Sequence, residues 1–220
     1  TTFPTWMAMS RNMVEIQLFQ CEKLQWLFGC DTTFTFPNMK ELTLQDLHCL
    51  DRWWETSNEV QGQEIMFPRL EKLSIVSCAK LTALPDTTLL GEPHGTMARS
   101  AFPALKELYL DFLDNFWKWE ATEGTQRGHM VFPKLEKLTI MNCSILTALR
   151  EAPVDGDHTM ARSAFPALKV LKLKCLSRFE SWHAVEGSKR EKLMFPQLEQ
   201  LVVIHCENMT TLCGQRTFPS

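Results

Sequence analysis

Three carboxylates, Asp51, Glu55 and Glu59, lie close together in the first third of the chain. A pair of carboxylates can act as general acid and general base when a nucleophile, an oxyanion-stabilising site or phosphate-binding glycines lie beside it. The sequence offers no such partner around these three residues. We therefore interpret them as part of a solvated surface and predict that the chain is not an enzyme.

Cysteine is the other residue type that could carry chemistry, since the chain has eight cysteines in 220 residues. An even number of cysteines can form a disulfide framework or bind zinc. However, no CxxC pair occurs, and the adjacent residues His48 and Cys49, like His205 and Cys206, lack the spacing of zinc ligands. We predict no metal site and expect the thiols to be structural.

The overall composition excludes several classes of function. Hydrophobic residues make up 45% of the chain, charged residues make up 22%, and the formal net charge is -3. This balance is typical of a chain that folds around an apolar core. It lacks the positive charge that nucleic-acid binding requires, and no apolar run approaches the length of a membrane span. We predict neither a nucleic-acid partner nor a membrane partner.

The sequence is built from repeats. Eleven residues, TMARSAFPALK, occur at 96–106 and again at 159–169, and the dipeptide FP recurs along the chain. Alignment on the Met or Leu that follows each FP gives seven blocks with apolar residues at positions 0, 3, 5, 8, 11 and 14, where position 0 is the first residue of a block. The blocks start near residues 13, 39, 70, 105, 135, 168 and 198. This periodicity predicts a single repeat domain over 1–220.

Two kinds of block alternate, so the repeating unit is a pair. Blocks one, three, five and seven carry Cys at position 8 and Leu at position 14, whereas the others carry Leu and Trp there. Coils of the same kind would lie about 9–10 Å apart in a sheet, and a disulfide needs Cα atoms within about 7 Å. We therefore predict inward-facing free thiols and a reducing compartment. The cysteines at position 8 are Cys21, Cys78, Cys143 and Cys206.

The tryptophans follow the same alternation. Trp53, Trp119 and Trp182 occupy position 14 of their blocks, so we predict that they belong to the core. Trp54 and Trp117 lie off the apolar pattern. They are candidates for an exposed contact.

The motif L-x-x-L-x-L predicts a short strand with one inward face, followed by a turn back across the other side. Burying a Leu contributes about 1.5–3 kcal/mol and ordering each residue costs about 1–2 kcal/mol, so single coils must stack. We predict an α/β-type repeat solenoid, a leucine-rich-repeat horseshoe with a concave parallel β-sheet, stacked FP phenylalanines and irregular convex loops at 85–101 and 150–164. Its strands are expected near 41–45, 72–76, 107–111, 137–141, 170–174 and 200–204.

The segment FPRLEKLSIVSCAKLTALP matches FPxLExLxIxxCxxLxxLP. It resembles the C-terminal leucine-rich-repeat region of plant nucleotide-binding leucine-rich-repeat disease-resistance proteins, particularly the coiled-coil class of cereals. The opening TFPTWMAMSRNMVEIQLFQCEKL resembles the FPxWM entry repeat of that family, and the resemblance covers essentially the whole chain. It implies a cytoplasmic protein-recognition and autoinhibitory module of an innate immune receptor in plant defence.

The resemblance also implies partners for the repeats. These are a pathogen effector or host protein, and the nucleotide-binding domain of the same receptor. No cofactor is predicted in this segment, and ATP or ADP is expected only in an upstream domain, because no GxxxxGK[ST] phosphate loop is present. The chain begins TTFPTWM and stops at RTFPS inside repeating material, so we expect it to be a fragment of a longer protein.

A partner is expected on the concave face, because positions 2, 4 and 6 of each block point away from the core on a rigid sheet. Exposed aromatic and apolar side chains suit protein recognition, and charge along this face changes from mainly acidic to basic past residue 130. The alternative is that inserts or further domains cover the face. The predicted partner-binding residues are Phe19, Val76, Glu107, Tyr109, Asp111, Lys137, Met141, Lys172 and Lys174.

Two other functions stay open at this point. A substrate-recruiting leucine-rich-repeat domain of a ubiquitin-ligase adaptor would follow an F-box rather than a phosphate loop. An extracellular receptor ectodomain fits less well, because the LxGxIP pattern of such repeats and paired flanking cysteines are missing.

Overall fold

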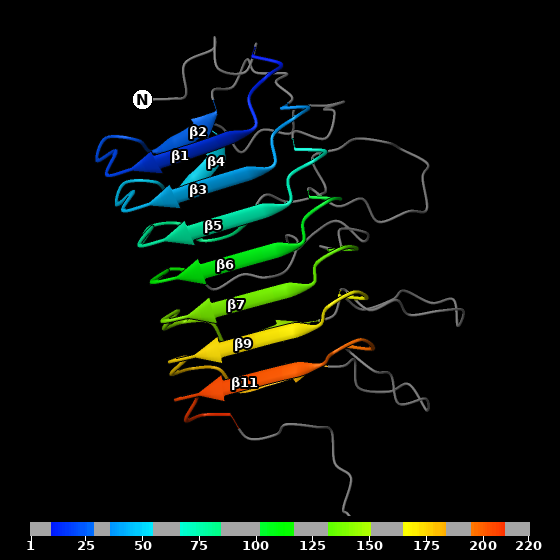
Figure 1. Ribbon diagram of the computed structural model, residues 1–220. Coiled ribbons are helices and arrows are strands. Elements are labelled where there is room, and N and C mark those ends of the chain that lie inside the picture. Colours follow the sequence, from blue (N-terminus) through cyan, green and yellow to red (C-terminus); the bar gives the residue numbers. More distant parts are fainter. Residues whose placement is uncertain are drawn as a thin grey trace, which may run out of the picture.

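Seven strands, one from each block, form a single parallel sheet along the molecule (Figure 1). The computed structural model describes residues 10–28, 36–54, 67–84, 102–116, 132–150, 165–183 and 195–209. The strands are β1 (Glu15–Phe19), β3 (Glu41–Gln45), β5 (Lys72–Val76), β6 (Glu107–Asp111), β7 (Lys137–Met141), β9 (Val170–Lys174) and β11 (Gln200–Ile204). The predicted repeat solenoid and its six strand ranges are confirmed, and β1 adds the strand of the first block.

The sheet keeps the repeats in register from coil to coil. Leu42 lies beside Leu73, and Leu73 lies beside Leu108, so equivalent positions form columns across the strands. In the five inner strands the second and fourth residues are buried, as the period-two pattern requires. In β1 and β11, the two end strands of the sheet, the equivalent residues are less completely buried.

Short strands on the return side of the coils reveal the two-block unit. β2 (Trp26–Phe28) pairs with β4 (Arg52–Trp54), and β8 (Ala148–Arg150) pairs with β10 (Ser181–His183). Each of these small sheets joins an odd-numbered block to the even-numbered block after it. Within the described ranges the coils contain no helix.

Trp53 is buried, which confirms its assignment to the core, and its indole N–H donates to the Ala83 carbonyl at 3.2 Å. The predictions for Trp117 and Trp119, and for the side chains of Trp54 and Trp182, lie outside the described residues. The predicted loop at 85–101 also lies outside the described residues. Of the loop predicted at 150–164, only the first residue is described, and it is the last residue of β8.

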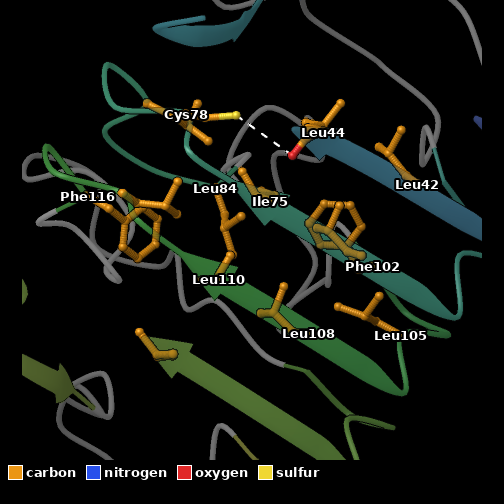
Figure 2. Close-up of a cluster of buried hydrophobic side chains, with 14 of the residues drawn as sticks. Leu42, Leu44, Ile75, Cys78, Leu84, Phe102, Leu105, Leu108, Leu110 and Phe116 are labelled. Carbon is orange, nitrogen blue, oxygen red and sulfur yellow. Dashed lines mark hydrogen bonds between the residues drawn. The ribbon is translucent and has the colours of Figure 1, made fainter. Parts of the chain in front are cut away.

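The FP phenylalanines stack along the core as predicted. Their ring centroids are separated by 5.5 Å between Phe36 and Phe67 and by 6.5 Å between Phe102 and Phe132. Figure 2 shows part of this core, in which Leu108 of β6 points to the same side of the sheet as Phe102. Each buried Leu contributes about 1.5–3 kcal/mol, so neighbouring coils stabilise one another through this shared core. The stacked phenylalanines are Phe36, Phe67, Phe102, Phe132 and Phe165, with Phe195 tilted at the end.

Candidate protein-recognition surface

The concave face consists of the first, third and fifth residues of the seven strands. Val76 on β5 lies beside Asp111 on β6, whereas Phe19 lies on β1 at the end of the sheet, with β3 between it and β5. The sheet therefore brings most of the predicted residues together and leaves Phe19 apart from them. The residues gathered on the consecutive strands β6, β7 and β9 are Glu107, Tyr109, Asp111, Lys137, Met141, Lys172 and Lys174.

The entry edge of the concave face consists of the residue before each strand and the first residue of the strand. In blocks two to five this pair reads Lys-Glu and Glu-Lys in alternation, so each charge lies beside an opposite charge on the next coil. The ion pairs along this edge are Lys72–Glu41 at 3.1 Å, Lys106–Glu71 at 2.7 Å, Lys40–Glu71 at 3.9 Å, Lys137–Glu107 at 3.7 Å and Lys169–Glu136 at 3.2 Å.

These pairs shift the ionisation of the groups involved. A hydrogen bond from Lys106, together with its charge, lowers the pKa of Glu71, and Glu41 raises the pKa of Lys72 in the same way. Ion pairs this exposed contribute little to stability. They do neutralise the edge: Glu107 and Lys137, both predicted to contact a partner, are already paired with each other.

A hydrogen-bonded network occupies the middle of the face. The Tyr109 hydroxyl donates to Asp111 Oδ2 at 3.0 Å, and Asn142 Nδ2 donates to Asp111 Oδ1 at 2.8 Å. Asp111 is only 7% exposed, so it differs from the outward-pointing acidic residue that the sequence predicted. Burial, and then Asp111, raise the pKa of Tyr109. Asp111 therefore links Tyr109 on its own strand to Asn142 on the next coil, while Tyr109 stays half-buried.

The exit edge consists of the last residue of each strand and the residue after it. That next residue has a φ between 49° and 55° in all seven coils, and none of the seven is glycine. The left-handed region costs an L-residue about 1–2 kcal/mol. Among the residues other than glycine, Asn, Asp and His tolerate it best. In the first six coils the N–H of this residue donates to the last carbonyl of the next strand, as Ser77 does to Asp111 at 2.9 Å. The seven residues are Gln20, Asp46, Ser77, Phe112, Asn142, Cys175 and His205.

Phe112 stands out among these seven because the other six are polar or small. The residue is 51% exposed, although a phenyl ring has no polar group that could hydrogen-bond locally and so offset the conformational cost. The sequence reasoning missed this residue, because only the positions expected inside the strands were considered for binding. The signal was present at position 7 of the blocks, where Phe replaces the residue types of the other coils.

Two lysines on β9 lack the ion pairs that the lysines of the entry edge form within the described residues. Lys172 lies beside Thr139 and Val202, and Lys174 lies beside Met141 and Ile204. Both lysines are half-buried, and neither has a carboxylate partner among the residues that the structure describes. The surface around them thus combines unpaired positive charge with apolar side chains.

The thiols at position 8 follow the prediction. Cys78 and Cys143 are buried, Cys21 and Cys206 are half-buried, and all four are free. The Cys78 thiol lies 3.5 Å from the carbonyl of Val76 and 3.9 Å from that of Leu44, and Figure 2 shows the contact with Leu44. Burial raises the pKa of Cys78 to about 11 and that of Cys143 to about 12. These thiols are protonated core residues. Cys30 and Cys213 lie outside the described ranges.

The other candidates for chemistry do not assemble into a site. Asp51 pairs with the adjacent Arg52 at 3.0 Å, and Glu55 and Glu59 lie outside the described residues. Across the described ranges, no three His, Cys, Asp or Glu side chains are grouped so that they could hold a metal ion. Nor does any helix in this part of the chain have the length and apolar character to cross a membrane.

Comparisons with known proteins give no indication of a function for this chain. Scans against protein-family models, curated proteins and solved structures found no match to this chain.

Proposed function

We propose that the chain is a protein-recognition and autoinhibitory module of a cytoplasmic plant immune receptor. The observation that carries the recognition part is the surface of β6, β7 and β9, where Tyr109, Met141, Lys172 and Lys174 stand outward on a rigid sheet without ionic partners among the described residues. Aromatic and apolar side chains beside unpaired charge suit binding to another protein. The immune context rests on the resemblance of the FPxLExLxIxxCxxLxxLP repeats.

Two kinds of partner fit this proposal. A pathogen effector or host protein would be held for recognition, and the receptor's own nucleotide-binding domain would be held for autoinhibition. Both would use the same lysines and apolar residues, because the entry edge is already neutralised by its own ion pairs. Competition between the two partners for one surface would couple recognition to release.

The first test is to read the complete open reading frame that encodes this chain. A phosphate loop upstream supports the receptor, whereas an F-box upstream supports a ubiquitin-ligase adaptor and overturns the immune proposal.

The second test is mutational, in that full-length protein. Tyr109→Ala, and the double change Lys172→Glu with Lys174→Glu, should weaken partner binding at least about 10-fold and leave protein abundance normal. Leu108→Ala serves as the matched control, since it removes a buried neighbour of Tyr109 and should cost about 2–5 kcal/mol of stability instead. Unchanged binding and cell-death signalling in both surface variants, at normal abundance, would remove the concave face from consideration.

A further inference from the structure

Phe112 combines two unfavourable features. Its φ of 52° places an aromatic residue in the left-handed region, and the residue is 51% exposed. The same left-handed φ recurs at this position in all seven coils, so the repeat imposes it, and Phe112 is the large apolar residue among the seven. An apolar surface laid over the ring would remove it from water and so offset one of the two costs.

The neighbours of Phe112 indicate the chemistry of such a surface. The Phe112 N–H donates to the carbonyl of Met141 at 3.3 Å, and Met141 lies beside Asp111, so it is the diagonal neighbour of Phe112 on the next coil. Met adapts readily to irregular apolar partners. One coil further, Lys174 lies beside Met141. Lys172 lies on the same strand, and neither lysine has a described carboxylate partner.

The spacing between Phe112 and the lysines sets the order in which a ligand would meet them. Phe112 and Lys174 are two strand spacings apart, which corresponds to about 10 Å, and Lys172 lies two residues back along β9, about 7 Å from Lys174. Asp111, the carboxylate adjacent to Phe112, is buried and accepts hydrogen bonds at both oxygens. A ligand that lies across β6, β7 and β9 would therefore meet Phe112 first, then Met141, and then the lysines of β9.

We propose that Phe112, Met141, Lys172 and Lys174 form a docking site for an acidic peptide segment that carries an apolar or aromatic side chain. The apolar side chain packs on Phe112 and Met141, and one or two carboxylates pair with the lysines. An extended chain rises about 3.3 Å per residue, so about three residues separate the apolar residue from the acidic ones. This site rests on the proposed function and specifies the partner's chemistry.

Synthetic peptides test the spacing directly. The full 220-residue chain is titrated with extended peptides that contain one Phe and one Asp-Asp pair separated by one to six residues, and with matched peptides in which Lys-Lys replaces Asp-Asp. Binding should be strongest at a separation of about three residues, weaken at least about 10-fold with Lys172→Gln and Lys174→Gln, and be absent for the Lys-Lys peptides. Binding that ignores the spacing, or that is absent for every peptide, overturns the site.

Phe112→Asn distinguishes a binding residue from a structural one, because the two effects have opposite signs. Asn tolerates the left-handed region, so the variant should melt about 2–4 °C higher while it binds the best peptide at least about 10-fold more weakly. Gln20→Asn is the matched control: it changes the equivalent residue of the first coil and should leave peptide binding unchanged. If Phe112→Asn lowers the melting temperature or keeps full affinity, the ring is structural and the proposal is wrong.

The two proposals fail in distinguishable ways. If Tyr109→Ala abolishes binding of a full-length partner while Phe112→Asn and the peptide series have no effect, protein recognition stands and this docking site does not. If the Tyr109 and lysine variants also have no effect on any partner, the recognition function itself is wrong.

Discussion

Along the entry edge of the sheet, the charged residues of neighbouring coils are paired from Lys40 to Lys169, whereas along the exit edge Lys174 has no described partner and Phe112 leaves half of its surface exposed. Both edges belong to the same strands, so their difference does not come from the fold. It comes from residue choice at two positions of the repeat. Because the charges of the entry edge are already paired with one another, they are less available to a ligand. The exit edge is therefore the better candidate for binding.

The largest expected effect concerns the buried thiols just beyond the exit edge. The pKa of Cys78 is raised from 9.0 to about 11 and that of Cys143 from 9.0 to about 12, so the folded state holds these protons more tightly than the unfolded state. Stability is therefore fully present below pH 9 and falls as the pH rises, by about 1.4 kcal/mol per pH unit for each thiol.

Chemical denaturation between pH 8 and 10.5 measures this loss. The double variant Cys78→Val with Cys143→Val should show a shallower decrease over that range, even if it begins from a lower stability. Equal slopes in both proteins would mean that the two thiols do not carry the alkaline sensitivity.

The next effect in size comes from Asp111. Asp111→Ala removes the acceptor for Tyr109 and Asn142, and leaving partly buried donors unpaired costs about 1–3 kcal/mol. Urea denaturation of the variant gives this cost, with Tyr109→Phe as the control that removes only one of the two hydrogen bonds and should cost less. If Asp111→Ala is as stable as the parent chain, the network does not hold the exit edge together.

The smallest effect is expected at the entry edge. Lys137→Glu puts a second carboxylate beside Glu107, from which the Lys137 ammonium is 3.7 Å away, and an exposed pair of this kind contributes about 0–1 kcal/mol. The loss of stability should shrink in 1 M salt, and Lys137→Gln, which removes the positive charge without adding a second carboxylate, should cost less than Lys137→Glu. A loss as large as that of Asp111→Ala would show that the two edges are not as different as the structure indicates.

The sequence was sufficient to predict the solenoid because its core is periodic. Leu, Ile and Phe recur at fixed positions, and a strand with period two has only one way to bury them. The stacked phenylalanines and the inward thiols of Cys78 and Cys143 follow from the same rule, since equivalent positions of parallel strands lie side by side.

The candidate surface was less predictable because its properties depend on pairs of coils. From its position in the strand, Asp111 is predicted to be an exposed carboxylate. In the structure it is buried and accepts hydrogen bonds from Tyr109 and Asn142. Likewise, nothing within block four alone shows that Glu107 is paired with Lys137. The left-handed conformation of Phe112 is set by the hydrogen bond to the following strand, which a single block does not contain.

The alternating charges of the entry edge also constrain how such a gene can change its length. Loss of block four alone would bring Glu71 beside Glu136 and Lys72 beside Lys137, so like charges would repel along the new junction. Loss of blocks four and five together would bring Glu71 beside Lys169 and preserve the attraction. Unequal crossing-over that adds or removes two blocks therefore keeps opposite charges side by side, and the identical segments that begin at residues 96 and 159 mark a step of that size.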